Sequence, residues 1–504
     1  MDEMKKALSP QGKASGKRRR VMWVVIIVIL VFCLLSVPSP DPSPPVSTLG
    51  KPFTWKQDET WNALETSFRT DRGVGCAGLR EAAENHFRQG RRYLNAIAST
   101  PTKLDAPVFV RLENTIFSLG TMVAACPERL QDYIQLITES RSLLKRQSRN
   151  WDMERREVRD RLYRLLYGGR TALEQVMLQG PADAYPAFIQ GELEPSVTPS
   201  FMFKNVTLHS GDILVSRGGA PTSALIARGN DYPGNFSHVA LLHVDEKTGV
   251  PSIIEAHIER GVVVSSLDDY IRDVKLRVMV LRPRADLPLI KADPMIPHRA
   301  AERALEETKS KHIPYDFEMD FREPSKRFCS EVASNAYHHF GITLWKGTTT
   351  MSAPGVVRWL SYFGVTHFDT QAPADLEYDP QLTVAGEWRD PEALWKDYVD
   401  NAVVESMLEG ADEGDKISYS WWMLAPARMA KAYSVMLNLF WGVGPIPEGM
   451  DAASALRNLE LSTRHEKIKE KVLAAAAAFE AKQGYRSPYW ELVRMAGEVR
   501  KGSQ

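Results

Sequence analysis

The sequence predicts an α+β protein: a small antiparallel sheet packed on helices, flanked by all-α regions and preceded by one N-terminal transmembrane helix. Three observations support this fold class. In residues 54–195 and 363–504, apolar residues recur every three or four positions, which is typical of amphipathic helices. Residues 200–362 instead contain short segments that are rich in β-branched residues and bounded by turn residues. Residues 21–37 carry no charge.

Length and composition allow two or three domains and exclude some functions. The 504 residues contain 63 Lys plus Arg and 63 Asp plus Glu, so the net charge does not indicate a nucleic-acid partner. The four cysteines are too few for a disulfide scaffold, although Cys76 and Cys126 could pair in an exported protein. A phosphate-binding Gly-x-x-x-x-Gly-Lys loop and the paired Cys and His spacing of a zinc site are both absent, so we expect neither a cofactor nor a metal.

The first 53 residues are expected to hold the protein in a membrane. Residues 1–20 end in a basic cluster, which favours a cytoplasmic N-terminus and a body on the other side. Residues 21–37 are just long enough for a transmembrane anchor, and the Pro-rich residues 38–53 predict an extended linker. A cleaved signal peptide is the alternative, but no Ala-x-Ala motif lies near Ser36, and an uncleaved anchor is therefore favoured.

Residues 54–195 are expected to form a helical region whose helices pack against one another. Residues 150–179 show the pattern of one amphipathic helix, which only Gly168-Gly169 would interrupt. Gly180-Pro181 ends the helical pattern, and a loop is expected from there to about Thr207.

Residues 200–362 are expected to form the α+β domain. The predicted strands are 212–215, 237–244, 252–258, 262–264 and 276–281, and the predicted helices are 222–228, 298–311 and 329–340. Residues 245–249 read as a hairpin connection in which Gly249 can adopt positive φ.

Residues 363–504 are predicted to be helical to the C-terminus. One segment, residues 421–445, is unusually rich in tryptophan and aliphatic residues, but it contains Asn438 and glycines and is not predicted to span a membrane. We expect a core helix hairpin there. An amphipathic membrane-contacting element and a lid over an acyl pocket are the alternatives.

Cys329 stands where the helix 329–340 is expected to begin. The first turn of a helix supplies partial positive charge and free N–H groups, which stabilise a thiolate and can hold a developing oxyanion. A buried, inert cysteine is nevertheless the commoner fate of a lone thiol. Cys329 alone therefore does not establish a nucleophile.

His238 and Glu255 are expected on one face of the hairpin. If Glu246 and Lys247 form a two-residue turn, His238 lies opposite Glu255; a pairing shifted by two residues places His238 opposite His257 and Glu255 opposite Ala240. The two side chains share a face in both registers. A carboxylate among apolar residues needs a partner such as an imidazole, although a histidine in this setting is often only a core residue. His257 could take over one of the roles.

Five motifs, taken together, resemble a known family. In chain order they are Gly211-Asp212, Ser237-His238, Glu255-Ala256, Pro314-Tyr315-Asp316 and Phe328-Cys329-Ser330-Glu331-Val332. This pattern, over about residues 205–345, resembles the permuted papain-like amidases of the YaeF/YiiX group. That group belongs to the NlpC-type superfamily, which also contains lecithin–retinol acyltransferase-like enzymes. The resemblance implies a permuted papain-like fold with Cys329 as nucleophile, His238 as base, Glu255 as the residue that orients the histidine, and Tyr315 lining the substrate site.

Three functions are consistent with these observations. The first is a cysteine amidase or peptidase anchored in the bacterial inner membrane, with its body in the periplasm and peptidoglycan peptides as substrate. The second is a lipid acyl-ester hydrolase or acyltransferase that uses the same site, with residues 421–441 near the bilayer. The third is a catalytically inactive binding or scaffold protein.

Overall fold

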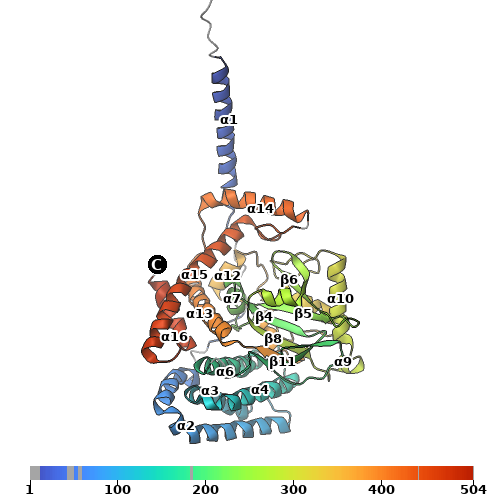
Figure 1. The fold of residues 1–504 in the computed structure, drawn as a ribbon, viewed down its shortest axis with the longest axis vertical. Helices are drawn as coiled ribbons and strands as arrows, with labels where there is room; N and C mark the ends of the chain where they lie inside the picture. Colours follow the sequence, from blue (N-terminus) through green and yellow to red (C-terminus); the bar gives the residue numbers. More distant parts are fainter. Residues whose placement is uncertain (1–11, 43–49, 55–58, 182–184, 441, 503–504) are drawn as a thin grey trace, which may run out of the picture.

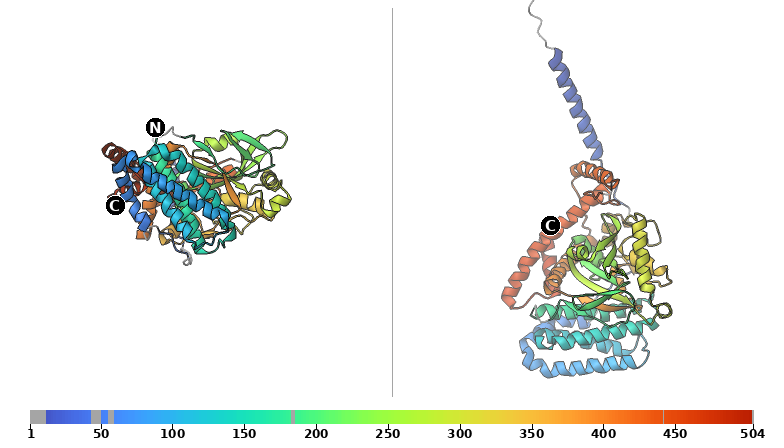
Figure 2. Two further views of the ribbon diagram at one scale, coloured as in Figure 1. Left: turned by 90° about the horizontal axis from the view of Figure 1, so that it is seen from below. Right: turned by 45° about the vertical axis from the view of Figure 1, so that its right-hand side comes forward.

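A seven-stranded antiparallel sheet lies between helical layers, and one long helix projects from the body (Figure 1). The computed structural model describes residues 12–42, 50–54, 59–181, 185–440 and 442–502. The projecting helix is α1 (Gly12–Leu35). Figure 2 shows from another side that α1 points away from all the other elements.

The strands alternate their apolar side chains between two cores. Val239 and Leu241 belong to the core that packs against the helices on one face of the sheet, and Ala240 and Leu242 belong to the core on the other face. Along the sheet the strands are β1 (Phe188–Gln190), β11 (Leu382–Trp388), β8 (Lys275–Pro283), β4 (Ile213–Gly218), β5 (His238–Val244), β6 (Pro251–His257) and β7 (Gly261–Ser266).

Two small sheets and five helices complete the middle of the chain. One sheet pairs β2 (Ser200–Phe203) with β3 (Val206–His209), and the other pairs β9 (Thr349–Thr350) with β10 (Asp369–Thr370). The helices are α7 (Pro221–Arg228), α8 (Leu267–Arg272), α9 (Pro288–Ala292), α10 (Ile296–Ser310) and α11 (Cys329–His338).

Two sequence predictions about the limits of the sheet are wrong. The loop predicted to about residue 207 contains β1 and β2, and β3 begins at its end. Residues 363–388, predicted to be helical, instead contain β10, the 3-10 helix η5 (Pro373–Glu377) and β11. Because β11 lies between β1 and β8, the sheet recruits strands from both flanking regions.

The N-terminal helices form a layer at the end of the body opposite α1 (Figure 1). They are α2 (Glu59–Ser99), α3 (Pro107–Ala125), α4 (Leu130–Gln147), α5 (Arg156–Leu162) and α6 (Gly168–Gln179). A π-helical turn, Tyr163–Tyr167, joins α5 to α6, so Gly168-Gly169 do not interrupt the helix. The longest helix, α2, is kinked at Gly75, where φ is 72°.

Among the described residues, α3 is the one helix that is long and apolar enough by composition to cross a membrane. It is a core helix of the N-terminal layer, because 61% of the apolar window is buried by neighbouring helices. In α1, the side chains described begin at Arg19, and the apolar ones from Val21 to Leu34 are exposed on all sides.

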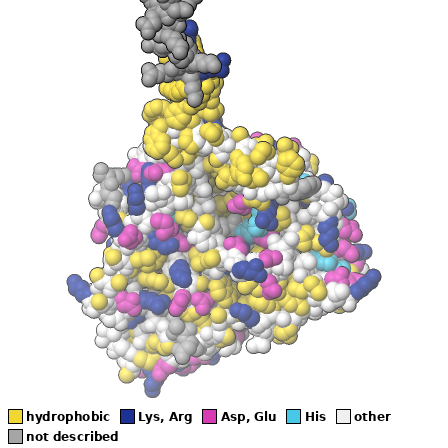
Figure 3. Space-filling model, turned by 45° about the horizontal axis from the view of Figure 1, so that its top comes forward, with side chains coloured by type: hydrophobic (Ala, Val, Ile, Leu, Met, Phe, Trp, Pro, Cys, Tyr) yellow, Lys and Arg dark blue, Asp and Glu magenta, His cyan; other side chains and the backbone are white. Residues whose placement is uncertain are grey.

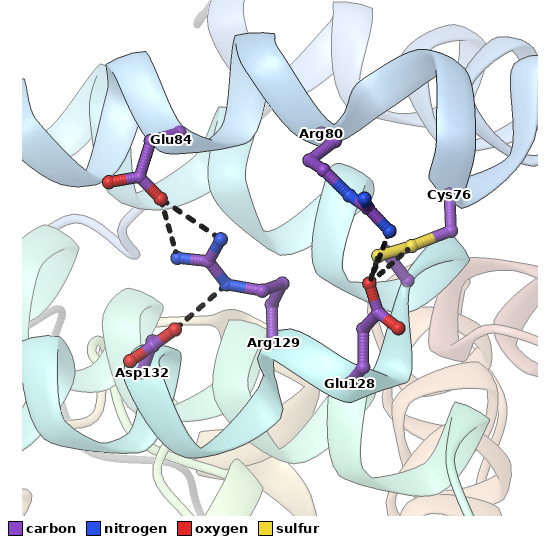
Figure 4. The surroundings of a disulfide bond; sticks show 7 residues. Cys76, Arg80, Glu84, Glu128, Arg129 and Asp132 are labelled. Carbon is purple, nitrogen blue, oxygen red and sulfur yellow. Dashed lines mark hydrogen bonds and ion pairs between the residues drawn. A yellow bond between two sulfur atoms is a disulfide. The ribbon is translucent and has the colours of Figure 1, made fainter.

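A disulfide joins Cys76 of α2 to Cys126, the residue that ends α3. The two Cα atoms lie 4.6 Å apart, although 50 positions separate the residues in sequence. Figure 4 shows Glu128 beside this disulfide, paired with Arg80 at 3.6 Å. The pairing that the sequence left open is therefore present.

The C-terminal region contains α12 (Pro354–Ser361), α13 (Pro391–Glu413), α14 (Leu424–Asn438), α15 (Ala452–Gln483) and α16 (Tyr489–Lys501). The core hairpin expected at residues 421–445 does not form. The segment is the 3-10 turn η6 (Trp421–Met423) followed by α14, and its large apolar side chains face outward. Figure 3 shows this hydrophobic surface at the base of α1.

Loss of the disulfide should destabilise the N-terminal layer. The double variant Cys76→Ser/Cys126→Ser should lose about 3–4 kcal/mol of unfolding free energy, because the bond closes a long loop in the unfolded chain. Urea unfolding followed by circular dichroism measures this loss. Cys33→Ser, in the exposed part of α1, is the control and should leave the midpoint unchanged. Equal midpoints for the double variant and the wild type would contradict the prediction.

Candidate active site

Cys329 is the first residue of α11 and is 5% exposed. The preceding residue, Phe328, is extended, and its N–H donates to Glu331 Oε2 at 2.9 Å, which fixes the start of the helix. The N–H groups of Cys329 and Ser330 belong to the first turn, where no helical carbonyl accepts from them. The thiol therefore lies beside backbone donors at the positive end of a helix.

Glu331 is buried two residues after Cys329, in the same first turn of α11. Burial raises the pKa of its carboxyl group to about 8, against the opposing effect of the Phe328 N–H. Nearby Asp316 adds to the rise. Glu331 is therefore protonated at neutral pH and brings no negative charge close to Cys329.

The hairpin adopts the second of the two predicted registers. Ala240 pairs with Glu255, and Gly249 in the connection has a φ of 69°. His238 and Glu255 therefore lie on one face of the sheet, and His238 Nε2 is 2.8 Å from Glu255 Oε2. The sequence predicted this proximity correctly.

The Glu255 carboxylate is a shared acceptor. Ser265 Oγ donates to Oε1 at 2.8 Å, and His257 Nε2 lies 3.0 Å from the same oxygen. These contacts, with the one from His238, lower the pKa of Glu255 well below its usual range although burial acts to raise it. Glu255 is therefore ionised and held in place. Ser265 was missed in the sequence, but it lies two positions from Val263, the partner of Glu255 on β7, so the register of β6 and β7 would have located it.

His238 also contacts Cys329. The Cys329 thiol is close enough to this ring to help raise its pKa, and Sγ lies 3.9 Å from the Ser237 carbonyl oxygen. Nε2 faces Glu255, so Nδ1 is the ring nitrogen that does not make this contact with the carboxylate. Burial opposes protonation of His238, but the hydrogen bonds with Cys329 and Glu255 outweigh it and raise the pKa to about 9. The arrangement stabilises the imidazolium that forms when His238 takes a proton.

His257 approaches the other oxygen of the Glu255 carboxylate, Oε1. The His238 and His257 ring centroids are 6.2 Å apart, and both rings approach the same carboxylate through Nε2. His238 therefore lies between the sulfur and the carboxylate, as a base must. His257 lies in a position that supports the carboxylate.

Tyr315 is beside Cys329 in the loop that leads to α11. Its backbone forms a bridge with Arg327, and its ring lies 5.0 Å from that of Phe317. Burial, followed by the charge of a Cys329 thiolate, raises the pKa of the phenol. Its hydroxyl therefore remains a donor. Asp316 orders this loop by accepting from the N–H groups of Glu318 and Asp320 at 2.9 and 2.7 Å.

The described residues contain one group of acidic, His or Cys side chains close enough together to surround a metal ion: Cys76, Cys126 and Glu128. Its two sulfur atoms are bonded to each other and cannot act as thiolate ligands. The group lies in the N-terminal helical layer, and Cys329 is not part of it.

Residues 207–385 match the family described as permuted papain-like amidase enzyme, YaeF/YiiX, C92 family. The match confirms the resemblance inferred from the five motifs. It includes Cys329, His238 and Glu255, and it extends through most of β11. No curated protein matches the chain.

The raised pKa of Glu331 predicts a pH-dependent stability. A folded pKa of about 8 against an ordinary value near 4.5 means that unfolding releases a proton between these pH values, so stability falls as pH rises through that window. Glu331→Gln removes the ionisation but keeps an acceptor for Phe328. The variant should match the wild type below pH 4 and exceed it by roughly 1–3 kcal/mol above pH 8. Urea midpoints measured from pH 4 to 9 test this, and parallel curves would refute it.

Proposed function

We propose that the protein is a membrane-anchored cysteine hydrolase, an amidase or peptidase, that acts on substrates outside the membrane. One observation carries the proposal: His238 lies 2.8 Å from the ionised Glu255 and close enough to the Cys329 thiol for the sulfur to help raise its pKa. A base that is held by a carboxylate and faces a nucleophile at a helix start is the arrangement that thiol acyl transfer requires. The family match supports a cysteine amidase.

Each step of acyl transfer can be assigned to one of these residues. His238 takes the proton of Cys329, and the thiolate attacks the substrate carbonyl carbon. The N–H groups at the start of α11 stabilise the tetrahedral oxyanion. Collapse breaks the bond to the leaving group, which takes the proton from His238. Water, deprotonated by His238, then cleaves the thioester and releases the acid and the thiol. Glu255 holds the imidazole in position throughout, and Tyr315 lines the substrate side.

Two features support placement outside the membrane. The exposed apolar surface of α1 between Val21 and Leu34 suits a lipid environment, and the basic cluster before it favours a cytoplasmic N-terminus. The Cys76–Cys126 disulfide suits an oxidising compartment. We place the body in the periplasm, anchored in a bacterial inner membrane, with peptidoglycan peptides as the first substrate to test.

A second candidate substrate is a lipid acyl ester. It is favoured by the position of the loop that follows α14. Gly449 of this loop lies so close to Phe317 that an added Cβ atom would be 2.5 Å from Phe317 Cδ2. Phe317 in turn packs on Tyr315. The catalytic steps are the same for an ester.

Cys329→Ser should abolish turnover. Purified full-length protein is incubated with peptidoglycan fragments and, separately, with phospholipid vesicles, and the products are followed by mass spectrometry. The variant should lose at least about a thousandfold in rate, because the nucleophile acts as a unit with its base. Cys33→Ser is the control and should keep full activity. Release of peptide products supports the amidase, and release of fatty acid supports the esterase. Turnover that survives in Cys329→Ser would overturn the assignment.

Substitutions of Glu255 and His257 should change the reactivity of the Cys329 thiol to different extents. Glu255→Gln removes the charge that helps to raise the pKa of His238, so His238 takes the proton of Cys329 less readily near pH 7. Alkylation of Cys329 by iodoacetamide at pH 7 should slow by roughly tenfold, the effect of one pKa unit. His257→Gln alters the same carboxylate without touching the contact between His238 and the thiol, and should slow alkylation much less. A larger loss in His257→Gln would reverse the assigned roles.

A further inference from the structure

The helix α14 and the turn after it present a stripe of large apolar side chains to the surface. Met429, Tyr433, Met436 and Phe440 recur at helical spacing and are 65, 51, 50 and 76% exposed. The preceding Trp421-Trp422 pair adds two indoles that are 59 and 53% exposed. Together these residues form what we call the α14 stripe. Its contiguous apolar surface indicates contact with an apolar phase or partner.

The opposite face of α14 is tied to the protein. Ser434 Oγ accepts from Ile446 N–H at 3.0 Å, and Lys431 Nζ donates to the Pro447 carbonyl oxygen at 2.6 Å. Arg428 Nη1 donates to the Leu35 carbonyl oxygen, at the end of α1, at 2.9 Å. Lys431 therefore turns back to the body, and Arg428 is held by the end of α1. Because residues 417–447 contain no Asp or Glu, the α14 stripe is left without charge.

The α14 stripe lies where α1 leaves the body. The two helices are in contact, and Figures 1 and 2 show α14 lying across the base of α1. A helix that crosses the foot of a membrane-spanning helix lies in the plane of the bilayer surface. Figure 3 shows the hydrophobic surfaces of α1 and of the helix at its base as neighbours.

We propose that the α14 stripe docks on a lipid bilayer at the boundary between headgroups and acyl chains. The inference rests on the anchoring by α1 that forms part of the proposed function. Tryptophan and tyrosine are the side chains enriched at this depth, and a helix lying in the interface buries an apolar face that carries residues such as Trp and Phe. Docking fixes the orientation of the body relative to the membrane. It also brings the loop from Ile446 to Met450, and with it the Tyr315 side of the site, close to the membrane surface.

Spin labels on the full-length chain test the docking. In a Cys33→Ser/Cys329→Ser background, single nitroxides are placed at Met436→Cys and at Phe440→Cys, and the protein is reconstituted in vesicles of phosphatidylcholine and phosphatidylglycerol. Val110→Cys on α3 is the matched control, because Val110 is also exposed, at 44%, but lies in the layer far from α1. The accessibility of each label to oxygen and to a water-soluble nickel chelate is measured.

Labels at 436 and 440 should be accessible to oxygen and at least about fivefold less accessible to nickel than the label at 110, since a bilayer excludes the chelate. Equal nickel accessibility at all three positions would overturn the docking, and so would protection from both reagents, which indicates a protein partner or a second copy. A separate label on the native Cys33, with Cys329→Ser, reports on α1. If the label at Cys33 is in lipid while the labels at 436 and 440 are in water, the docking alone is refuted. If the label at Cys33 is in water, the anchor is refuted.

Discussion

The pairing of buried charges between α6, β8 and α13 determines how the three parts of the chain fit together. Arg170 lies between Glu174 at 3.2 Å and Glu377 at 2.7 Å, and Arg277 of β8 reaches Glu174 at 2.5 Å as well as Asp397 of α13. All these side chains are almost completely buried. An unpaired charge in such a place costs several kcal/mol, on the order of 3–5 when a partner is removed. These charge pairs therefore favour a single arrangement of the N-terminal helices, the sheet and α13. The papain-like part is thus an integral part of a larger folded body.

This arrangement also determines the geometry of the site, because the strands of the sheet connect the buried charges to the site residues. Arg277 fixes β8, β8 pairs with β4, and β4 pairs with β5 so that Ser216 lies opposite His238. The next pairing, Ala240 with Glu255, brings the carboxylate to the imidazole. Cys329 approaches from α11, which packs on β5 and β6. The distance between sulfur and imidazole thus depends on backbone pairing and helix packing, which are stiff, and less on flexible side chains.

Features set by local periodicity could be predicted from the sequence, and features set by distant partners could not. The shared face of His238 and Glu255 follows from the period of two in a strand, and the position of Cys329 follows from the helical pattern after it. The register needed the structure, because two pairings satisfied the same pattern. The strand Leu382–Trp388 was missed since its residues are almost all buried and show no alternation. The segment 421–445 was misassigned because apolar composition does not reveal whether a face has a partner.

The two ends of the body serve different purposes. The N-terminal helices lie farthest from α1 and contribute a packed core, a disulfide and the buried charges that hold the sheet (Figure 1). The α14 end contributes little core of its own: few of its residues are buried, and they join Ala452 and Leu456 of α15 in a small cluster. Natural soluble surfaces rarely keep so much apolar area exposed unless it meets a partner. Since the loop after α14 packs on Phe317, and Phe317 packs on Tyr315, the α14 stripe is connected by packing to the loop that leads to Cys329.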